Sequence, residues 1–344
     1  MKFKTQLLHS SGGDQQTGAL TTPIYQSSTF TYGTAAEGKA RFAGEQAGFI
    51  YSRMGNPTVQ ALEQQLAVLE GADEALVVAS GMAAVSSIFY TLASAGDEVA
   101  FIDPVYGGTA AFLVNTLSRA GINVSRYASD DDLLANIHPA TKLVLFEPIT
   151  NPNLKVTDYR KIKAAAAKTS AITVCDNTFL TPYLFKPLEH GIDLVMHSGT
   201  KYLSGHGDII AGVVAGRTEL MQAVRTIALK HIGAAIGPQE AYLLQRGLRT
   251  LALRMDAHLA GAAKVAAFLA QHPAVSKVIY PGLTTDAGYP VLAETVGAFG
   301  GMAYTVGKFG LHTLIPLGKL MLTVYVTMAI FIFVILGSIL RYYK

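Results

Sequence analysis

A single lysine, Lys201, stands among small hydroxyl residues and glycines, directly after the apolar run Gly191 to Met196, which is typical of a strand. A lysine that forms a Schiff base needs a short, rigid approach and neighbours that hold an anion. Ser198 and Thr200 offer two hydroxyls to a phosphate, and the nearby glycines let backbone come close. This arrangement is what a pyridoxal phosphate (PLP) lysine requires, whereas the alternative is a surface lysine in a turn.

Two further motifs follow predicted strands. Ser80, Gly81 and Met82 open a helical stretch, so the free N–H groups of Gly81 and Met82 can hold a phosphate with the help of the helix dipole. Asp176 comes directly after an apolar run that ends at Cys175. A carboxylate there can pair with a pyridine nitrogen and keep it protonated, which makes the ring an electron sink. Capping of the following turn is the alternative.

Three loops carry side chains that suit the rest of such a cofactor. Tyr106 lies in a predicted turn, where an aromatic ring could stack on a cofactor ring. Asn151 could donate a hydrogen bond to a phenolic oxygen, although an Asn-Pro pair is also typical of a turn. Tyr51 and Arg53 lie in the third loop, and the guanidinium suits a phosphate dianion.

Composition narrows the class of protein. The 344 residues are enough for about two domains with a large core. A net charge of +3 without a basic stripe argues against nucleic acid as a partner. The single cysteine, Cys175, cannot form an intramolecular disulfide, fits a reducing compartment and reads as a small buried hydrophobe. HExxH, CxxC and Walker A spacings are absent from the sequence, so neither a metal nor a nucleotide site is predicted.

The middle of the chain alternates between two kinds of pattern. Apolar, β-rich runs predict strands at Glu74 to Ala79, Glu98 to Ile102, Lys142 to Phe146 and Ala171 to Cys175. Helical periodicity covers Thr58 to Glu70, Met82 to Ala93 and Tyr159 to Lys168. Such alternation predicts an α/β fold with a mostly parallel sheet, covered by helices, that binds ligands at the carboxyl ends of its strands.

A long helix is predicted from Leu248 to Gln271, with Arg249, Arg254 and His258 toward solvent. His272 and Pro273 end this helix, and Val275 to Tyr280 is the first strand of a smaller domain. The chain therefore divides into four regions: an N-terminal arm (1–48), a large domain (49–245), a truncated small domain (246–302) and an apolar tail (303–344).

In their order along the chain, these motifs resemble the Cys/Met-metabolism family of PLP enzymes, which includes methionine γ-lyase, cystathionine γ-lyase, cystathionine β-lyase and the cystathionine and homocysteine synthases. The resemblance covers about Thr5 to Met302 and implies the type I PLP-dependent transferase fold. The stretches that carry it are PIYQSSTF, YSRMGNPT, SGMAA, DPVYGGT, EPITNPNLKVTD, CDNTFLTPYL and HSGTKYLSGHGD.

The resemblance implies roles for the candidate residues. Lys201 would be the Schiff-base lysine and general base. Asp176 would be the partner of the pyridinium, and Tyr106 the stacked ring that also helps the leaving group depart. The phosphate ligands would be Gly81, Met82, Ser198 and Thr200.

Partners also follow from the resemblance. Tyr51 and Arg53 look like the pair that reaches the phosphate of a neighbouring subunit. This implies an active dimer inside a homotetramer, acting on a small amino-acid substrate.

Within the family, the stretch from Ala40 to Gly48 looks most like methionine γ-lyase. Two positions depart from that enzyme: Gly108, where it has a cysteine, and His231, where it has an aspartate. The expected reaction is therefore γ-elimination from methionine, homocysteine or cystathionine. A γ-replacement transferase of the cystathionine or homocysteine synthase type is the alternative.

The resemblance stops after Met302. From Val306 the sequence looks like a transmembrane helix of the dicarboxylate (glutamate) symporters, a shorter and less specific match. Leu320 to Leu340 is a run of 21 uncharged residues, about 31 Å long as a helix and close to the thickness of a bilayer core. We expect this helix to associate with membrane and leave the catalytic domain in the cytoplasm; a buried core helix is the alternative.

What the tail replaces matters for the chemistry. The family's C-terminal segment carries an arginine that grips the substrate α-carboxylate, and no residue here can be matched to it. A carboxylate clamp aligns the Cα–H bond for proton removal, so its loss predicts weak turnover even when PLP binds well. The extreme alternative is a non-catalytic, membrane-tethered fusion or truncation product.

Overall fold

The computed structural model describes residues 1–10, 13, 17–273, 275–307 and 312–316. The chain divides into two compact units. The first combines residues 1–151 with 156–252, and the second combines residues 152–155 with the chain from Leu253 onward. The predicted membrane helix at 320–340 lies outside the described residues.

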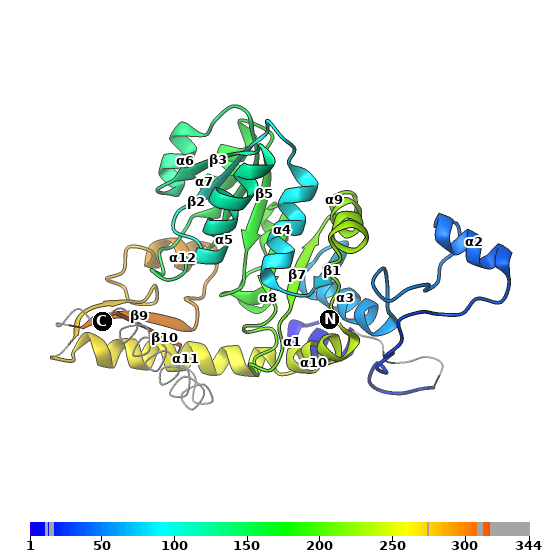
Figure 1. The fold of residues 1–344 in the computed structure, drawn as a ribbon. Coiled ribbons are helices and arrows are strands. Elements are labelled where there is room, and N and C mark those ends of the chain that lie inside the picture. Colours follow the sequence, from blue (N-terminus) through cyan, green and yellow to red (C-terminus); the bar gives the residue numbers. More distant parts are fainter. Residues whose placement is uncertain (11–12, 14–16, 274, 308–311, 317–344) are drawn as a thin grey trace, which may run out of the picture. The chain divides into compact units, whose positions relative to one another are not determined.

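A seven-stranded sheet forms the centre of the first unit, in the order β1-β7-β6-β5-β4-β2-β3. Of these strands only β7 runs against the others, because β1 and β6 both pair with it antiparallel. This confirms the predicted mostly parallel sheet, which β7 makes a mixed one (Figure 1). Its strands are β1 Glu74–Val78, β2 Glu98–Ile102, β3 Asn123–Tyr127, β4 Thr141–Phe146, β5 Ile172–Asp176, β6 Leu194–Ser198 and β7 Gly212–Gly216.

Helices follow most strands and cover the sheet. Local signals set their ends: for α3, the Asn56 side chain accepts the N–H of Thr58, Pro57 occupies the first turn, and Gly71 ends the helix with a φ of 70°. The helices of this unit are α1 Phe3–His9, α2 Ala35–Ala43, α3 Pro57–Glu70, α4 Gly81–Leu92, α5 Gly107–Ala111, α6 Asp130–Asn136, α7 Tyr159–Ala167, α8 Thr181–Leu184, α9 Thr218–Arg225 and α10 Pro238–Leu248. Shorter π or 3-10 turns are η1 Phe112–Thr116, η2 Leu117–Ala120, η3 Pro187–His190 and η4 Thr226–Ile232.

The main core lies between α4 and one face of the sheet. Side chains alternate along a strand, so Leu194 and Met196 of β6 share this face with Leu76 and Val78 of β1. They pack with Phe89 of α4, and all five are at most 1% exposed. A fully buried side chain of this size contributes about 1.5–3 kcal/mol to stability, so this layer holds the carboxyl edge of the sheet rigidly.

The opposite face carries a buried polar pair directly beneath that edge. His197, whose side chain points away from Met196 and Ser198, lies 2.5 Å from Glu70 at the end of α3, measured from Nε2 to Oε1. Both side chains are fully buried. Removing one partner of such a pair leaves an uncompensated polar group, so the pair fixes α3 against β6.

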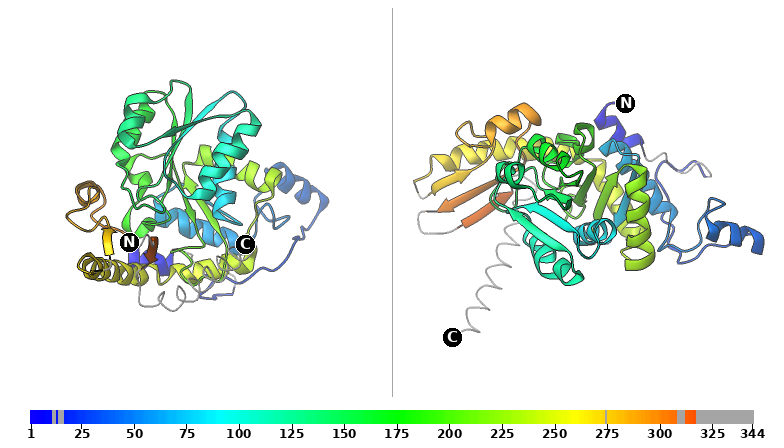
Figure 2. Two further views of the ribbon diagram at one scale, coloured as in Figure 1. Left: turned by 60° about the vertical axis from the view of Figure 1, so that its left-hand side comes forward. Right: turned by 90° about the horizontal axis from the view of Figure 1, so that it is seen from above.

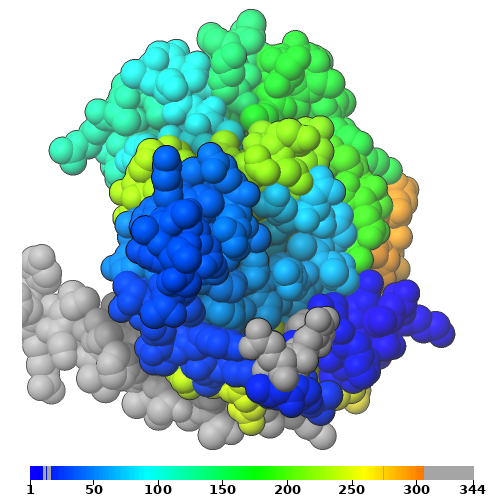
Figure 3. Space-filling model, turned by 90° about the vertical axis from the view of Figure 1, so that its right-hand side faces the viewer, coloured from blue at the N-terminus to red at the C-terminus, as the bar shows by residue number. Residues whose placement is uncertain are grey.

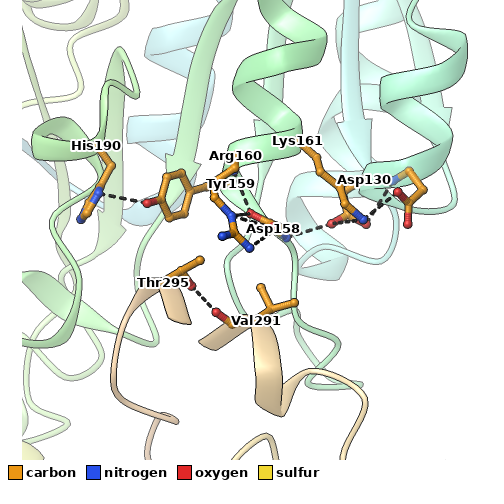
Figure 4. Close-up of polar contacts among 9 residues, drawn as sticks. Asp130, Asp158, Tyr159, Arg160, Lys161, His190, Val291 and Thr295 are labelled. Carbon is orange, nitrogen blue, oxygen red and sulfur yellow. Dashed lines mark hydrogen bonds and ion pairs between the residues drawn. The ribbon is translucent and has the colours of Figure 1, made fainter. Parts of the chain in front are cut away.

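Polar contacts join α6 and α7, beside the loop that leads from β4. Asp158 caps α7 by accepting the N–H of Arg160 at 2.9 Å, and the Arg160 guanidinium folds back onto the same carboxylate at 2.7 Å. Lys161 pairs with Asp131 of α6 at 2.6 Å, and Asp130 accepts the N–H of Asp158 (Figure 4). These contacts anchor the far end of the loop that contains Asn151.

The part of the N-terminal region that carries α2 projects as an arm, whereas Leu7 of α1 is 1% exposed and its carbonyl accepts a hydrogen bond from Gln65 of α3. The predicted boundary of the arm at residue 48 stays a prediction. Helix α2 lies at the end of an excursion from the body of the first unit, and the views of Figures 1 and 2 agree on this. Figure 3 shows N-terminal residues in blue across the face from which the arm projects, beside α3 in lighter blue. Large apolar side chains are exposed along it, among them Leu20 (83%) and Phe42 (64%).

The second unit has its own small core. Its sheet has the order β10-β9-β8 and is antiparallel throughout. Ala262 and Ala266 pack with Tyr280 and Ala303. The sheet continues to Pro316, past the end at 302 that the sequence suggested. Its elements are α11 Leu251–Ala270, β8 Val275–Ile279, α12 Tyr289–Thr295, β9 Met302–Gly307 and β10 His312–Pro316.

The predicted helix from Leu248 to Gln271 needs two corrections. It is two helices, α10 and α11, which meet between Leu248 and Leu251. The expectation that its cations face solvent is also wrong, because His258 is 6% exposed and Arg254 is half-buried. Burial lowers the pKa of Arg254 to about 10. Small and apolar residues occur all around α11, so the sequence pattern does not define a solvent face. Among the described helices, none has the length and apolar character needed to cross a bilayer.

Candidate active site

A cavity of about 310 Å³ opens at the carboxyl ends of β1, β2, β4, β5 and β6 in the first unit. Parallel strands bring their last residues to one edge, so motifs far apart in sequence meet there. Eight of the ten predicted site residues line the cavity: Gly81, Met82, Tyr106, Asn151, Asp176, Ser198, Thr200 and Lys201.

Lys201 is exposed at this cavity and is carried by a tight turn that follows β6. The N–H of Lys201 donates to the carbonyl of Ser198 at 3.1 Å, and the N–H of Gly205 donates to the carbonyl of Lys201 at 2.8 Å. A Cβ built at Gly199 would lie 3.1 Å from the Cβ of Ala211, so the turn packs closely against the segment leading into β7. The lysine therefore has the short, rigid approach expected from the sequence.

One wall of the cavity is the N-terminus of α4. The Ser80 side chain accepts the N–H of Ala83 at 3.0 Å and caps the helix. The N–H groups of Gly81 and Met82 belong to the first turn, where no intrahelical carbonyl is available to them. A Cβ at Gly81 would lie 3.0 Å from the Cβ of Ser198, so only glycine lets these two predicted phosphate ligands come so close.

Thr200 is tied to the neighbouring backbone. Its hydroxyl accepts the N–H of Ala211 at 3.0 Å, and lies 3.3 Å from the carbonyl of the same residue. The hydroxyl therefore has one acceptor position engaged, and its hydrogen can turn toward Ala211 or toward an anion in the cavity.

Asp176 belongs to a hydrogen-bonded chain that the sequence motifs alone did not suggest. Its Oδ1 accepts both the N–H of Thr178, at 3.1 Å, and the hydroxyl of Thr178, at 2.5 Å. The same hydroxyl accepts the N–H of Ser198 at 2.8 Å. One threonine thus connects the end of β5 to the end of β6. Loss of solvation raises the pKa of Asp176, while Thr178 and the nearby His197 act in the opposite direction.

A second carboxyl group, Glu147, lies in the same cavity and is 5% exposed. It accepts the N–H of Tyr106 at 2.7 Å and the N–H of Asn151 at 2.8 Å. Burial, followed by the neighbouring Asp176 carboxylate, raises the pKa of Glu147 well above its usual range. Two carboxyl groups in one wall make the cavity suited to a cationic ring or amine.

The ring of Tyr106 is half exposed and folds over Gly108. A Cβ at Gly108 would lie 2.6 Å from the Cε1 atom of Tyr106. Any side chain at position 108 would therefore displace the ring from its present position.

Tyr51 and Arg53 do not join the other candidates. Arg53 lines a different cavity of about 420 Å³, where its Nη1 donates to the carbonyls of Leu229 and Lys230 at 2.7 and 3.1 Å. The Arg53 guanidinium also lies 5.5 Å from the centre of the Tyr51 ring. This separation within one chain fits the expectation that the pair serves another subunit, which stays a prediction.

Sequence reasoning missed part of the cavity wall. Glu147 follows β4 directly, as Asp176 ends β5, so the position after a buried strand is the signal that could have found it. Thr178 stands two residues after Asp176, within a motif already singled out. The additional lining residues are Ser80, Val85, Thr109, Glu147, Ile149, Thr178, Phe179, Met196 and Ile210. In the described part of the chain, no three His, Cys, Asp or Glu side chains gather as metal ligands would.

Comparison with known proteins identifies the family. The family model described as Cys/Met metabolism PLP-dependent enzyme matches residues 4–319, which extends past Met302. L-methionine γ-lyase of Pseudomonas putida is 45% identical over 305 residues, 87% of this chain and 76% of that protein. Cystathionine β-lyase of Lactococcus lactis is 43% identical over 305 residues, 87% of this chain and 77% of that protein.

Among solved structures, an O-acetylhomoserine (thiol)-lyase of Campylobacter jejuni with a pyridoxyl-phosphate-modified lysine is similar, with a TM-score of 0.85 and 32% identity. The match covers 90% of this chain and 86% of that one. The chain therefore belongs to the Cys/Met metabolism PLP-dependent enzymes, and its cofactor is pyridoxal 5′-phosphate.

The residues around the cavity fit this cofactor. A volume of about 310 Å³ is in the range of small-molecule sites. The helix N-terminus with the Ser198 hydroxyl can hold a phosphate, a partly buried acid can face a protonated ring nitrogen, and an exposed lysine is available for the aldehyde.

Proposed function

We propose that this chain is a carbon–sulfur lyase that eliminates the γ-sulfur group of methionine, homocysteine or cystathionine. The observation that carries the proposal is the meeting of Lys201 and Asp176 in one cavity at the carboxyl edge of the sheet. The likeness to methionine γ-lyase and cystathionine β-lyase supports the substrate class. With methionine and water, the expected products are methanethiol, ammonia and 2-oxobutanoate.

The side chains would divide the work as follows. Bound pyridoxal phosphate supplies an electron-withdrawing ring that delocalises the charge left when the Cα proton is removed. Lys201 Nζ would take that proton and then one from Cβ, so that the electron pair of the broken Cβ–H bond expels the γ-sulfur. The turn that follows β6 holds the amine at the mouth of the cavity for this task. Asp176 would keep the pyridine nitrogen of the cofactor protonated. Tyr106 would cover the cofactor ring and donate a proton to the departing sulfur.

Asn151 would donate to the phenolic oxygen, and Gly81, Met82, Ser198 and Thr200 would hold the phosphate. Tyr51 and Arg53 would complete the phosphate site of a second copy in a homo-oligomer.

A product assay tests the proposed function. The PLP-loaded protein is incubated with methionine, homocysteine and cystathionine, and 2-oxobutanoate is measured. Release from at least one of them is expected, and absence of 2-oxobutanoate with all three would contradict a γ-lyase. The sequence predicts weak turnover, because residues 303–344 stand where the family has its carboxylate-binding segment. This stays a prediction, since residues 317–344 lie outside the described part of the chain.

A γ-replacement transferase is the second candidate. It is favoured by the likeness to the O-acetylhomoserine (thiol)-lyase of Campylobacter jejuni. Incubation with O-acetylhomoserine and a thiol distinguishes the two: a replacement enzyme forms the new thioether, whereas a lyase releases 2-oxobutanoate.

Thr178→Val is expected to weaken PLP binding by about 10- to 100-fold, since a hydrogen bond to a charged group is worth about 1.5–3 kcal/mol. Valine keeps the shape of the side chain but removes the hydroxyl that serves Asp176 and the Ser198 N–H. Titration of the apo-protein with PLP, followed by absorbance, gives the affinity. Thr178→Ser keeps the hydroxyl and serves as the matched control. Equal affinity of the valine and serine variants would contradict this role.

A further inference from the structure

Glu147 lies in the wall of the cavity, and no step of the mechanism above uses it. It follows β4 directly, and its side chain is buried at 5% exposure. Each carboxylate oxygen has its own partner: Oε1 accepts the N–H of Tyr106 at 2.7 Å, and Oε2 accepts the N–H of Asn151 at 2.8 Å. Both oxygens are therefore engaged with backbone rather than with a side chain.

The two N–H donors belong to loops that leave different strands. Tyr106 ends the loop after β2 and stands at the start of α5, while Asn151 lies in the turn after β4. Tyr106 is 50% exposed, so packing alone holds its ring weakly. The hydrogen bond from the Tyr106 N–H to Glu147 fixes the main chain at this residue and so restrains the direction in which the side chain leaves it.

We propose that Glu147 is a positioning residue that ties these two loops to each other and so sets where Tyr106 and Asn151 stand in the active site. The inference rests on the proposed function for the roles of Tyr106 and Asn151, but the tie itself is a property of the apo-protein. A carboxylate suits this task because it offers an acceptor to each loop. A glutamine offers one oxygen acceptor and would place its NH₂ against the other N–H.

The electrostatic setting is consistent with a structural use of this group. Burial, and after it the Asp176 carboxylate, raise the pKa of Glu147, whereas the two N–H donors act in the opposite direction. A residue that must keep both bonds is well placed next to a rigid strand, and Glu147 follows the last residue of β4 directly.

Hydrogen exchange of the apo-protein tests the tie without any need for activity. In Glu147→Gln, the amide of Tyr106 or of Asn151 is expected to exchange at least about tenfold faster, because one N–H loses its acceptor. The matched control is Glu98→Gln: Glu98 is also buried, but it lies at the amino end of β2, away from the cavity. Exchange of both loops as in the unmodified protein would overturn the proposal.

Kinetics of the loaded enzyme separate positioning from a general loss of stability. Glu147→Gln is expected to lower kcat at least about tenfold, while a Glu98→Gln protein of equal or lower Tm keeps its kcat. A kcat that simply follows Tm in both variants would overturn the inference. If Glu147→Gln does not fold, Glu147→Asp takes its place, since the shorter side chain keeps the charge but cannot reach both loops. Unchanged exchange in both loops of that variant would equally overturn it.

Failure of this inference can be told apart from failure of the proposed function. Faster loop exchange in Glu147→Gln with no 2-oxobutanoate from any substrate would support the tie and contradict the lyase. If the enzyme releases 2-oxobutanoate but the amide exchange of both loops is the same with and without Glu147, only the positioning role of Glu147 is contradicted.

Discussion

Replacing Lys201 with alanine is expected to lower turnover by about 100- to 10,000-fold, the usual range for loss of a general acid–base group. The effect should be this large because the Lys201 amine alone among the lysines of the first unit lines the cavity that contains Asp176. Steady-state release of 2-oxobutanoate by protein loaded with PLP gives the rate.

Lys277→Ala is the control for that experiment, because Lys277 is exposed on β8 of the second unit. It should leave turnover unchanged. A Lys201→Ala protein that retains more than about a tenth of the original kcat would mean that another group removes the Cα proton.

Asp176→Asn is expected to lower turnover by at least about 100-fold while still allowing PLP to attach to Lys201. Asparagine keeps the size of the side chain and an acceptor for Thr178, but it removes the charge that favours a protonated ring. Removing one member of a desolvated ion pair costs about 3–5 kcal/mol. Because every 1.4 kcal/mol, roughly, is a tenfold change in rate, this cost corresponds to a loss of at least about 100-fold. Turnover and the absorbance of the bound cofactor are measured on the same sample.

The matched control is Asp193→Asn. Asp193 precedes β6 at the opposite end of the sheet, where it accepts the N–H and hydroxyl of Thr173. It should change stability but not the rate of the folded enzyme. Similar rate losses in both variants would show that Asp176 acts on the sheet rather than on the cofactor.

Much of the sheet could be predicted because its strands are buried on both sides. The predicted strand Glu98 to Ile102 is β2 without change, and every residue of it is buried. Strand β3, in contrast, has the mixed sequence NVSRY and lies at the edge of the sheet, so it gave no continuous apolar run. Strand β7 was not predicted either, because its short sequence GVVAG is rich in small residues and gives only a weak strand pattern. In the structure it lies between β1 and β6.

The candidate site could be predicted where the side chain itself has a reactive or charged group that suits the cofactor. Lys201 and Asp176 have side chains that few structural roles require at the end of a strand, and both line the cavity. Glu147 and Thr178 act on backbone N–H groups, and the partners of a backbone group depend on the folded loops. Tyr51 and Arg53 were singled out by the sequence but do not line this cavity: Arg53 lines a different one, with its guanidinium beside the Tyr51 ring.

The central claim is that PLP attaches to Lys201, and reduction of the loaded protein with borohydride tests it most directly. Reduction makes the linkage between cofactor and lysine permanent, so digestion and peptide mapping then locate the modified residue. The account predicts a pyridoxyl label on Lys201, in the peptide that also contains Tyr202. A label on another lysine, or no label after reduction of protein saturated with PLP, would contradict it.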